Sequence, residues 1–429
     1  MAGTFMRSVE SLLRRRIWFA CASIFLAGAC ARVALLALMH WHPQVEFFEM
    51  ERIARNLAET GTLGNPYSVP TGPSAHHAPF YPLLLSLIYR GLGYGRGAAV
   101  ATAAMNMVFA CATAALLPLL ARAAGLPVSV GVAAGALTAV PAHILKEVCW
   151  ETAMNGLVLL ACTFLAIAWL RKAAPNWTPR SVGMGVLMGF AMIATPPVLC
   201  VLLAFAAFIV VASLWRRKIW LCFQAALLLA GAAVGVSPWI ARNYIQLGAP
   251  AFVRDNYPLE FSLSNHDGVY ALAQYNVLVG YPNNAQVMRH PESNPAEARL
   301  VRQMGEIAYQ HARLQEALRW CSSHKAVFAR LTMERFFLFW CTVGSTQVYK
   351  SLLIGLLRIA GLWGAVLMLR PWDASRAALF AIVLAYPLPY YLIQIDTRYE
   401  YPMDWCMFLF AAYAGYRAMR HYAPRPAGV

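Results

Sequence analysis

The sequence predicts an all-α integral membrane protein, a bundle of about 10–12 membrane-crossing helices with amphipathic helices in the outer loops. Three observations indicate this class. Of the 429 residues, 60% are hydrophobic and 13% are charged, whereas soluble domains are about 45–50% apolar and about 25% charged. Apolar runs long enough to cross a bilayer recur along the chain. Lys and Arg gather at one side of these runs.

The apolar runs predict ten crossings, because a crossing helix needs about 17–25 apolar residues. The stretch 182–214 is too long for one helix and is interrupted at 195–197 (Thr-Pro-Pro), so it predicts two crossings. Short apolar pieces at 80–93 and 333–345 are either surface helices or further crossings. Arg32, inside the first run, should face the bundle and find a partner. The other crossings are expected near 17–39, 98–121, 128–145, 151–170, 219–238, 349–370, 376–393 and 403–419.

The basic residues orient the predicted helices. Clusters such as Arg14–Arg16 and Arg216–Lys218 fall on one side, which the positive-inside rule assigns to the cytoplasm together with both termini. Of the 19 acidic residues, 17 then lie on the outer side, where 40–97 and 239–348 are long loops. We expect one membrane domain over 1–429, in a bacterial inner membrane, with its chemistry on the periplasmic face. The net charge of +16 then reflects contact with membrane lipids, and nucleic acid is not expected as a partner.

The first outer loop holds the candidate catalytic carboxylates. Residues 45–58 have apolar positions three and four apart, which predicts an amphipathic helix at the membrane surface. Glu46 and Glu49 would share one face of this helix, and we expect one of them to be a general base whose pKa is raised toward neutrality by partial desolvation. The alternative is that both belong to a solvated face. Glu51 and Arg55 have the spacing of a surface ion pair.

Two adjacent histidines follow in the same loop. His76 and His77 can bind a metal or a phosphate, or steady the catalytic carboxylate. Adjacent histidines rarely ligate one metal alone, and no third ligand is evident in the sequence, so a hydrogen-bonding role is favoured. We accordingly expect no metal and no cofactor. The phosphate-binding pattern GxxxxGK[ST] is also missing from the sequence, which argues against an enzyme driven by ATP or a nucleotide sugar.

Motifs follow one another in a characteristic order: a carboxylate after the first helix, IARNLAETGTLGNPY at 53–67, HHAPFYP at 76–82, SPWIARNYIQLGAPAFVRDN at 237–256 and QIDTRYEYPMD at 394–404. This order resembles the GT-C glycosyltransferases, and within them family 39, the protein mannosyltransferases and aminoarabinose transferases. The resemblance covers nearly the whole chain. It implies a GT-C bundle that transfers a sugar, with inversion, from a polyprenyl-phosphate donor to a glycan, lipid or protein acceptor.

Members of this family carry an Asp in the first outer loop, as a base or as the group that orients the acceptor. The first loop of this chain has no Asp. Matching the flanking motif places Glu49 at that role, with Glu46 as the second choice. Because Glu reaches one methylene further than Asp, the same chemistry is retained in principle.

The implied reaction also needs cations for the departing phosphate. Arg binds phosphate through two hydrogen bonds and keeps its charge. Arg242, Arg254 and Arg398 stand in motifs that match the family. The alternative for each is a helix-end anchor at the lipid headgroups.

A second group of carboxylates is expected to bind sugar, metal or acceptor. Glu147 and Glu151 are four apart and should point the same way from one helix, with Lys146 beside them. The alternative is an ordinary solvated helix end. The further substrate-binding candidates are His77, Asn256, Asn265 and Tyr399.

Two other functions fit the same composition. A transporter or flippase would show internal repeats and charges near the membrane midplane, whereas the acids here gather in outer loops. A non-catalytic GT-C-like lipid-binding or assembly protein fits the lack of an Asp in the first loop. Separate Glu46→Gln and Glu49→Gln changes distinguish these functions from an enzyme.

Overall fold

The structure is a computed structural model that describes residues 2–141, 144–171, 177–273, 289–341, 348–370 and 373–422. Within these ranges the chain is helical and forms no strand, apart from isolated bridges of Gly64 with Pro73 and of Leu272 with Ile395. The helices are α1 (Ala2–Arg15), α2 (Ile17–Leu38), α3 (Glu49–Thr60), α4 (Phe80–Leu92), α5 (Arg96–Ala123), α6 (Val128–Ala139), α7 (Ile144–Cys149), α8 (Thr152–Arg171), α9 (Trp177–Ala194), α10 (Val198–Trp215), α11 (Trp220–Leu247), α12 (Tyr257–Ser264), α14 (Pro295–Met304), α15 (Glu306–Ser323), α16 (Lys325–Cys341), α17 (Val348–Met368), η1 (Ala374–Arg376), α18 (Ala377–Ala385), η2 (Leu388–Leu392), α19 (Thr397–Glu400), η3 (Tyr401–Met403) and α20 (Asp404–Tyr422).

Five of the described helices are long and apolar enough to cross a membrane: α2, α5, α8, α10 and α11. Helices α4 and α6, the 352–368 part of α17 and the segment 377–392 are apolar but shorter. The helical membrane architecture predicted from the sequence is therefore confirmed. The number of ten crossings stays a prediction.

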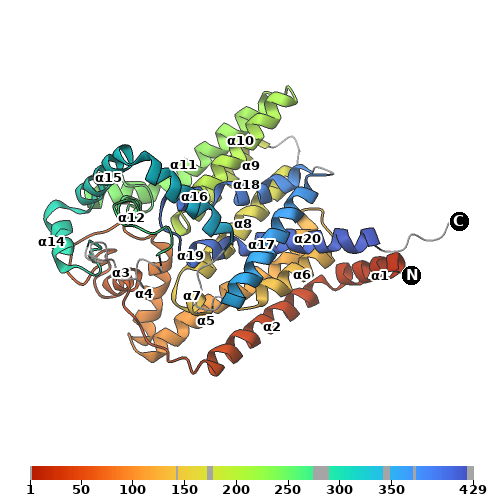
Figure 1. Ribbon diagram of the computed structural model, residues 1–429, viewed down its shortest axis with the longest axis horizontal. Coiled ribbons are helices and arrows are strands. Elements are labelled where there is room, and N and C mark those ends of the chain that lie inside the picture. Colours follow the sequence, from red (N-terminus) through yellow and green to blue (C-terminus); the bar gives the residue numbers. More distant parts are fainter. Residues whose placement is uncertain are drawn as a thin grey trace.

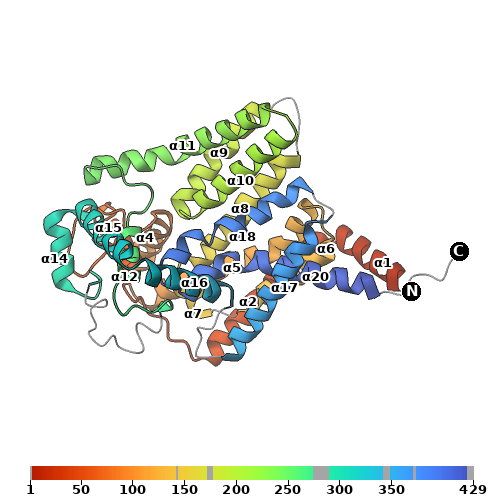
Figure 2. The ribbon, with the colours of Figure 1, turned by 45° about the horizontal axis from the view of Figure 1, so that its top comes forward.

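The body is elongated, and its two ends differ (Figures 1 and 2). Helix α1 and the end of α20 lie at one end. The opposite end is formed by α3, α4, α12, α14 and α15, which we call the cap. These helices come from the segments 40–97 and 239–348. The two long segments predicted to lie outside the membrane thus meet at one end of the bundle.

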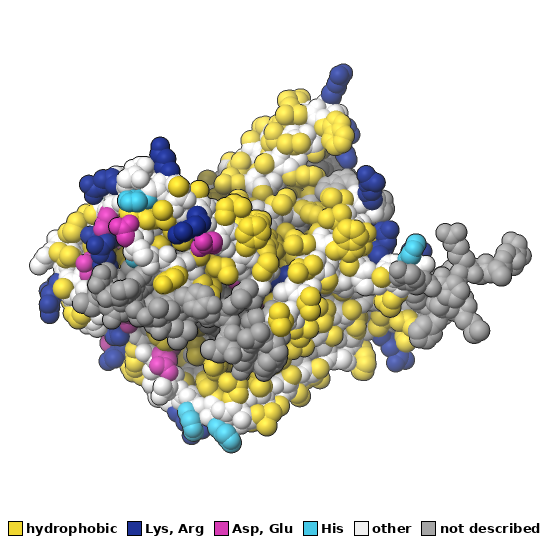
Figure 3. Space-filling view, in the orientation of Figure 1, with side chains coloured by type: hydrophobic (Ala, Val, Ile, Leu, Met, Phe, Trp, Pro, Cys, Tyr) yellow, Lys and Arg dark blue, Asp and Glu magenta, His cyan; other side chains and the backbone are white. Residues whose placement is uncertain are grey.

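The surface fits a chain that spans a bilayer. In Figure 3, hydrophobic side chains cover the middle of the visible face, the Asp and Glu side chains lie on its cap half, and Lys and Arg occur toward both ends. Large apolar side chains such as Phe19, Ile219 and Leu356 are exposed on α2, before α11 and on α17. In water such a belt would aggregate, whereas lipid tails cover it at no cost.

The break predicted in 182–214 is present. Helix α9 ends at Ala194 and α10 begins at Val198, because Pro196 and Pro197 cannot continue the hydrogen-bonding pattern of α9. The hydroxyl of Thr195 in this turn donates to Asn155 of α8 at 2.8 Å. This bond ties the turn to a helix of the bundle.

Helices α9 and α11 pack backbone against backbone. A Cβ added to Gly185 or Gly189 of α9 would meet backbone atoms of α11, and one added to Gly231 or Gly235 would meet backbone atoms of α9. Small residues permit this approach in membrane helices. Helix α11 spans 28 residues, so it extends past the predicted 219–238 and reaches the cap.

We expect Gly185→Ala to destabilise the protein by about 1–3 kcal/mol, because the added methyl overlaps the carbonyl oxygen of Leu228. Gly183→Ala, on the same helix, is the matched control, since a Cβ there meets nothing within 4 Å. The control should change stability by less than about 1 kcal/mol, in the stabilising direction. Thermal unfolding in detergent compares the two variants. Equal midpoints would contradict the close approach of α9 and α11.

Buried arginines hold other helices together. As predicted, Arg32 faces the bundle: its Nε donates to Glu147 Oε2 of α7 at 2.7 Å, and both side chains are fully buried. Arg358 of α17 bonds Glu400 Oε2 at 2.5 Å and Asp404 Oδ1 at 2.8 Å. The ion pairs of Arg358 with Glu400 and Asp404 fix the start of α20 and the residues just before it.

Candidate active site

A cavity of about 280 Å³ lies where the cap meets the bundle. Six segments far apart in the sequence line it: the start of α3, residues 77–82, the α7–α8 junction, the α9–α10 turn, residues 252–260 and residues 386–402. The described charged residues that line it are Glu49, Glu151, Glu260, Arg254 and Arg398. Aromatic side chains complete the wall, among them Tyr81, Trp150, Tyr257, Tyr386, Tyr390 and Tyr399.

Glu49 reaches the cavity because α3 begins at that residue. The backbone N–H of Phe48 donates to the carboxylate of Glu51 at 3.0 Å, which caps the helix start. Met50 and Ala54, on the inner face of this helix, are buried. Gly61 ends the helix in the left-handed conformation at φ 76°.

Two expectations for this loop were wrong. Glu46 does not share a helix face with Glu49, because it precedes the helix, where it is exposed and accepts a hydrogen bond from Gln44. Glu51 does not pair with Arg55: its carboxylate is used in the helix cap, and Arg55 pairs with Glu59 instead. Both errors come from placing the helix start at 45 rather than at Glu49.

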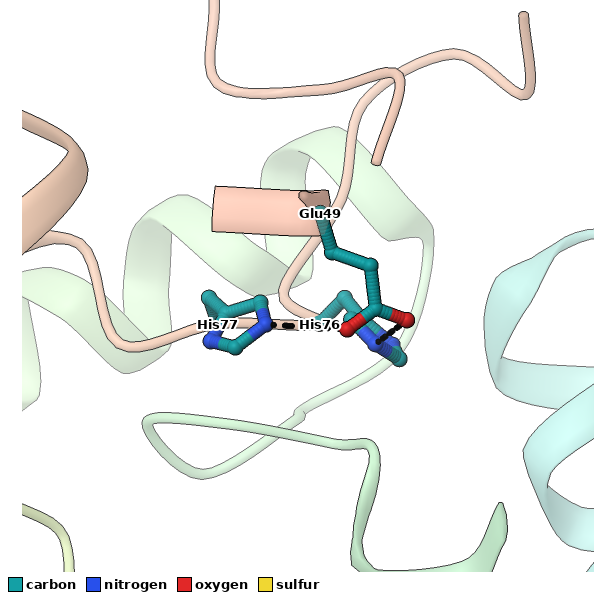
Figure 4. A group of neighbouring side chains, drawn as sticks. All are labelled: Glu49, His76 and His77. Atoms are coloured by element: carbon teal, nitrogen blue, oxygen red, sulfur yellow. Dashed lines mark hydrogen bonds and ion pairs between the residues drawn. The ribbon is translucent and has the colours of Figure 1, made fainter. Parts of the chain in front are cut away.

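Figure 4 shows Glu49 between the two histidines. His76 Nε2 lies 3.0 Å from Glu49 Oε1, and His77 Nε2 lies 3.3 Å from Glu49 Oε2. His290, from the segment before α14, approaches Oε1 to 3.6 Å. One carboxylate therefore contacts three imidazoles, two from the first long segment and one from the second.

This environment sets the charge of the group. Burial alone would raise the pKa of Glu49, but the nearby imidazoles of His76 and His290 and the hydrogen bonds from His76 and His77 hold it well below its usual range. Burial lowers the pKa of His76, yet the Glu49 carboxylate raises it above the ordinary value overall. Burial and the charge of Arg254 lower the pKa of His77. Glu49 is thus an ionised carboxylate at neutral pH, and the expectation that desolvation raises its pKa was wrong, because the imidazoles outweigh the effect of burial.

Glu49, His76 and His77 can also hold a metal ion. Their donor atoms all lie within 4.8 Å of one another, and two imidazoles with a carboxylate form a common ligand set for zinc. This set is not apparent in the sequence, because Glu49 precedes His76 by 27 residues. No third ligand was evident in the sequence, whereas the structure brings Glu49 to the two histidines; the expectation of no metal stays a prediction.

Arg398 is held rigidly at the cavity. Its backbone N–H donates a hydrogen bond to Asp396 Oδ1 at 2.9 Å, and Asp396 thereby caps the start of α19. Its guanidinium lies 4.3 Å from the ring centre of Trp150, and Tyr399 stacks on Tyr390 at 4.6 Å. Burial would lower the pKa of Arg398, but Tyr399 and Asp396 raise it above the ordinary value. The cation therefore keeps its charge although it is surrounded by protein.

Arg254 and Asn256 enter the cavity together. Arg254 Nε donates to the side-chain oxygen of Asn256, which orients the guanidinium. The Asn256 amide nitrogen and one oxygen of Glu151 are buried without a hydrogen-bond partner among the described residues. Buried polar groups of this kind are normally satisfied, so a ligand or water is expected to contact them.

Three predicted site residues have structural roles elsewhere. Arg242 donates to the carbonyls of Ser74 and Leu63, so it fixes the loop before the histidines. Asn265 donates to the carbonyls of Phe261 and Leu392 and accepts from a buried Arg. Neither Arg242 nor Asn265 lines the cavity. The third predicted residue, Glu147, does not line it either.

Glu147 and Glu151 do not point the same way. Helix α7 ends at Cys149 and α8 begins at Thr152, so the two residues belong to different local structures. Glu147 turns into the bundle to pair with Arg32, whereas Glu151 lines the cavity. The side chain of Lys146 lies outside the described residues.

The sequence reasoning missed several cavity residues: Trp150, Asn155, Glu260, Tyr386 and Tyr390. Trp150 and Tyr390 are aromatic residues in apolar surroundings, where core packing is the ordinary interpretation. Glu260 lies in α12, six residues after Arg254. Its closeness in sequence to Arg254, a predicted site residue, was a signal that could have identified Glu260 as a cavity residue.

The fold is shared with a solved enzyme. The crystal structure of the oligosaccharyltransferase of Archaeoglobus fulgidus in complex with Zn and sulfate matches with a TM-score of 0.55 at 15% identity, over 93% of this chain and 49% of that one. The same archaeal enzyme, AglB, in complex with an inhibitory peptide and a dolichol-phosphate matches with a TM-score of 0.52 at 13% identity, over 95% and 52%. The chain thus spans about half the length of that enzyme.

A weaker similarity is to ArnT from Cupriavidus metallidurans bound to undecaprenyl phosphate, with a TM-score of 0.36 and 15% identity, over 92% of this chain and 78% of that one. No family model matches the sequence. No curated protein matches it either. The GT-C fold predicted from the sequence is confirmed by the archaeal structures.

Proposed function

We propose that this chain is a membrane glycosyltransferase that moves a sugar from a polyprenyl-phosphate donor to a hydroxyl acceptor in the cavity below the cap. One observation carries the proposal: a single cavity brings the Glu49 carboxylate together with Arg254 and Arg398 from three distant segments. The shared fold supports it, since a protein of similar structure is an oligosaccharyltransferase in complex with an inhibitory peptide and a dolichol-phosphate. We place the reaction on the periplasmic face of a bacterial inner membrane.

Arg254 and Arg398 take the phosphate of the donor. The phosphate is the leaving group, so charge accumulates on its oxygens as the sugar departs. Two guanidiniums in a largely buried site stabilise this charge strongly, because little water screens them. Arg254 is hydrogen-bonded to Asn256, and Arg398 lies over the ring of Trp150. Because both guanidiniums are already in position, little reorganisation accompanies the reaction.

Glu49 takes the proton of the acceptor. The acceptor oxygen forms a bond to the anomeric carbon, the bond from that carbon to the phosphate oxygen breaks, and the electron pair leaves with the phosphate. The acceptor proton passes to Glu49, whose carboxylate is ionised at neutral pH; the neighbouring histidines lower its pKa, so its contribution comes from its position rather than from strong basicity. Attack from the face opposite the phosphate inverts the anomeric carbon.

The remaining polar wall suits a sugar. Glu151 and Asn256 offer buried polar atoms that lack partners among the described residues. The hydroxyl-bearing side chain of Tyr390 also lines the cavity. Aromatic rings such as Tyr399 and Trp150 provide flat apolar surfaces on which a sugar ring packs.

We expect Arg398→Ala to weaken binding of polyprenyl phosphate by about 10–100-fold, because hydrogen bonds to charged groups contribute roughly 1.5–3 kcal/mol. Arg302→Ala is the matched control, since Arg302 is exposed on α14 in the cap. Native mass spectrometry of the purified chain with added undecaprenyl phosphate measures both. Equal affinity in the two variants would remove Arg398 from the phosphate site.

The proposal is tested by a transfer assay in membranes that contain the chain. Radiolabelled polyprenyl-phosphate hexose, pentose and aminosugar donors are added, and lipid, protein and polymer fractions are extracted. Label should move from one donor into one fraction, which identifies the sugar and the class of acceptor together. If no donor is consumed while undecaprenyl phosphate still binds, the chain is a lipid-binding protein with a GT-C fold rather than an enzyme.

A further inference from the structure

We propose that Trp150 is a positioning residue that holds the base Glu49 and the phosphate-binding Arg398 in register with each other. Its indole contacts Phe48, the residue before Glu49, and it also contacts Arg398. The roles given to Glu49 and Arg398 rest on the proposed function. The contacts of Trp150 do not depend on it.

Trp150 reaches the cavity because the helix is interrupted between α7 and α8. Helix α7 ends at Cys149 and α8 begins at Thr152. The two residues between them, Trp150 and Glu151, line the cavity. The indole is half-buried and packs against the apolar cluster that contains Met50 of α3. One cluster therefore seats both the indole and the helix that begins at the base.

The indole supports the chain immediately before the base. It stacks on Phe48 with ring centres 5.1 Å apart and ring planes at 27°. Phe47, one residue earlier, has a φ of 54°, a left-handed conformation that is strained for a residue other than glycine. Such a conformation persists only where surrounding contacts hold it. The stack on Trp150 is one of these contacts, and it lies next to Glu49.

The contact with Arg398 orients the guanidinium and leaves its hydrogen-bond donors to a ligand. The guanidinium lies 4.3 Å from the ring centre of Trp150 and 5.3 Å from that of Tyr399. Its Nε is 3.6 Å from Asp396 Oδ2, too far for a hydrogen bond, and is buried without a hydrogen-bond partner among the described residues. Aromatic faces attract a guanidinium without using its N–H groups. These groups therefore stay available to phosphate oxygens.

A single side chain thus touches the segment that presents the base and the cation that takes the phosphate. The proposed reaction needs the acceptor oxygen and the departing phosphate in line, and a displacement of about 1 Å can cost about 10²-fold in rate. Glu49 and Arg398 come from opposite ends of the sequence, so no local structure fixes their separation. The rigid indole of Trp150 fixes it by contacting both segments.

The first measurement is binding of undecaprenyl phosphate, which carries no sugar, to the full chain by native mass spectrometry. Trp150→Leu should weaken binding by about 3–30-fold, the range of a partly desolvated cation–π contact. Trp150→Phe keeps an aromatic face and should bind within about twofold of the wild type. Trp18→Leu is the matched control, because it removes a Trp that is exposed on α2 and should change nothing.

A double-mutant cycle separates positioning from general packing. If Trp150 acts on the phosphate through Arg398, Trp150→Leu should change the affinity by less than about twofold in chains that already carry Arg398→Ala. A general loss of packing would instead add to the loss from Arg398→Ala, and the unfolding midpoint of Trp150→Leu in detergent would fall with it. If Trp150→Leu does not fold, Trp150→Met takes its place in the cycle.

The second measurement is sugar transfer at saturating donor, which reports on the base. Trp150→Leu and Phe48→Leu should each lower kcat by about 10–100-fold, the cost of a misplaced reacting group. Phe48→Leu should leave the binding of undecaprenyl phosphate unchanged, because Phe48 does not line the cavity.

The inference is overturned if the losses of affinity in the cycle are additive, or if Trp150→Leu binds and transfers like the wild type. A loss of transfer in Trp150→Leu without a loss of undecaprenyl phosphate binding would mean that Trp150 acts only on the sugar ring, and would refute its positioning of Arg398. If the wild type transfers no sugar with any donor, the proposed function fails, and the binding cycle alone decides whether Trp150 positions Arg398.

Discussion

Replacing Glu49 by Gln is expected to slow sugar transfer by about 10²–10⁴-fold, the usual contribution of a positioned base. The substitution keeps the size and the hydrogen-bonding ability of the side chain but removes its charge and its capacity to accept the acceptor proton. The side chain stays at the start of α3, beside His76 and His77. The measurement is the initial rate of label transfer at saturating donor.

Glu46→Gln is the matched control for this change. Glu46 lies three residues earlier, is exposed and does not line the cavity. Its substitution should leave the rate within about twofold of the wild type, as surface changes usually do. Similar losses in both variants would mean that the loop is disturbed as a whole, and no loss in Glu49→Gln would refute the assigned base.

Replacing Glu147 by Gln is expected to destabilise the protein by about 3–5 kcal/mol, because it leaves the charge of Arg32 buried without a counter-charge. Both side chains are fully buried, at the contact of α2 with α7. The unfolding midpoint in detergent should fall clearly, and because Glu147 does not line the cavity, the cavity residues should keep their chemistry in the chains that remain folded.

A double variant separates the cost of burying an unpaired charge from the contribution of the ion pair itself. Arg32→Met with Glu147→Leu removes both charges and keeps apolar volume, so stability should return to near the wild-type level or exceed it. A double variant as unstable as Glu147→Gln would mean that the site needs hydrogen bonds that the apolar pair cannot supply, such as those from Arg32 to the carbonyls of Gly28 and Ala139.

Much of the fold was predictable because local chemistry decides it. The long apolar runs at α2, α5 and α8 need no tertiary information. The prolines after Ala194 end α9 wherever it packs, and Arg32 had to face inward because lipid offers it no partner. Helix α11 exceeded its prediction because hydrogen bonds from Arg242 and Asn243 tie its last turns to the loops at 63–74 and 251–252, which hydropathy does not reveal.

The site was predictable only in part, because its residues meet through tertiary contacts. Glu49, Arg254 and Arg398 were found through motifs, and all three line the cavity. The link from Glu49 to His76 spans 27 residues and the link to His290 spans the two long segments, so spacing alone gives no sign of either. The role of Glu147 was mistaken because the helix is interrupted between Cys149 and Thr152, so that Glu147 pairs with Arg32 while Glu151 lines the cavity.

Turnover of a polyprenyl-phosphate sugar by the purified chain tests the central claim most directly. The chain is placed in lipid nanodiscs with donor and a membrane extract as the source of acceptor, and the released polyprenyl phosphate is counted by mass spectrometry. We expect many molecules released per chain, a loss of about 10²–10⁴-fold in Glu49→Gln and no loss in Glu46→Gln. Equal release by the wild type and Glu49→Gln, or no release above protein-free nanodiscs with any donor, would contradict the claim that this cavity is a sugar-transfer site.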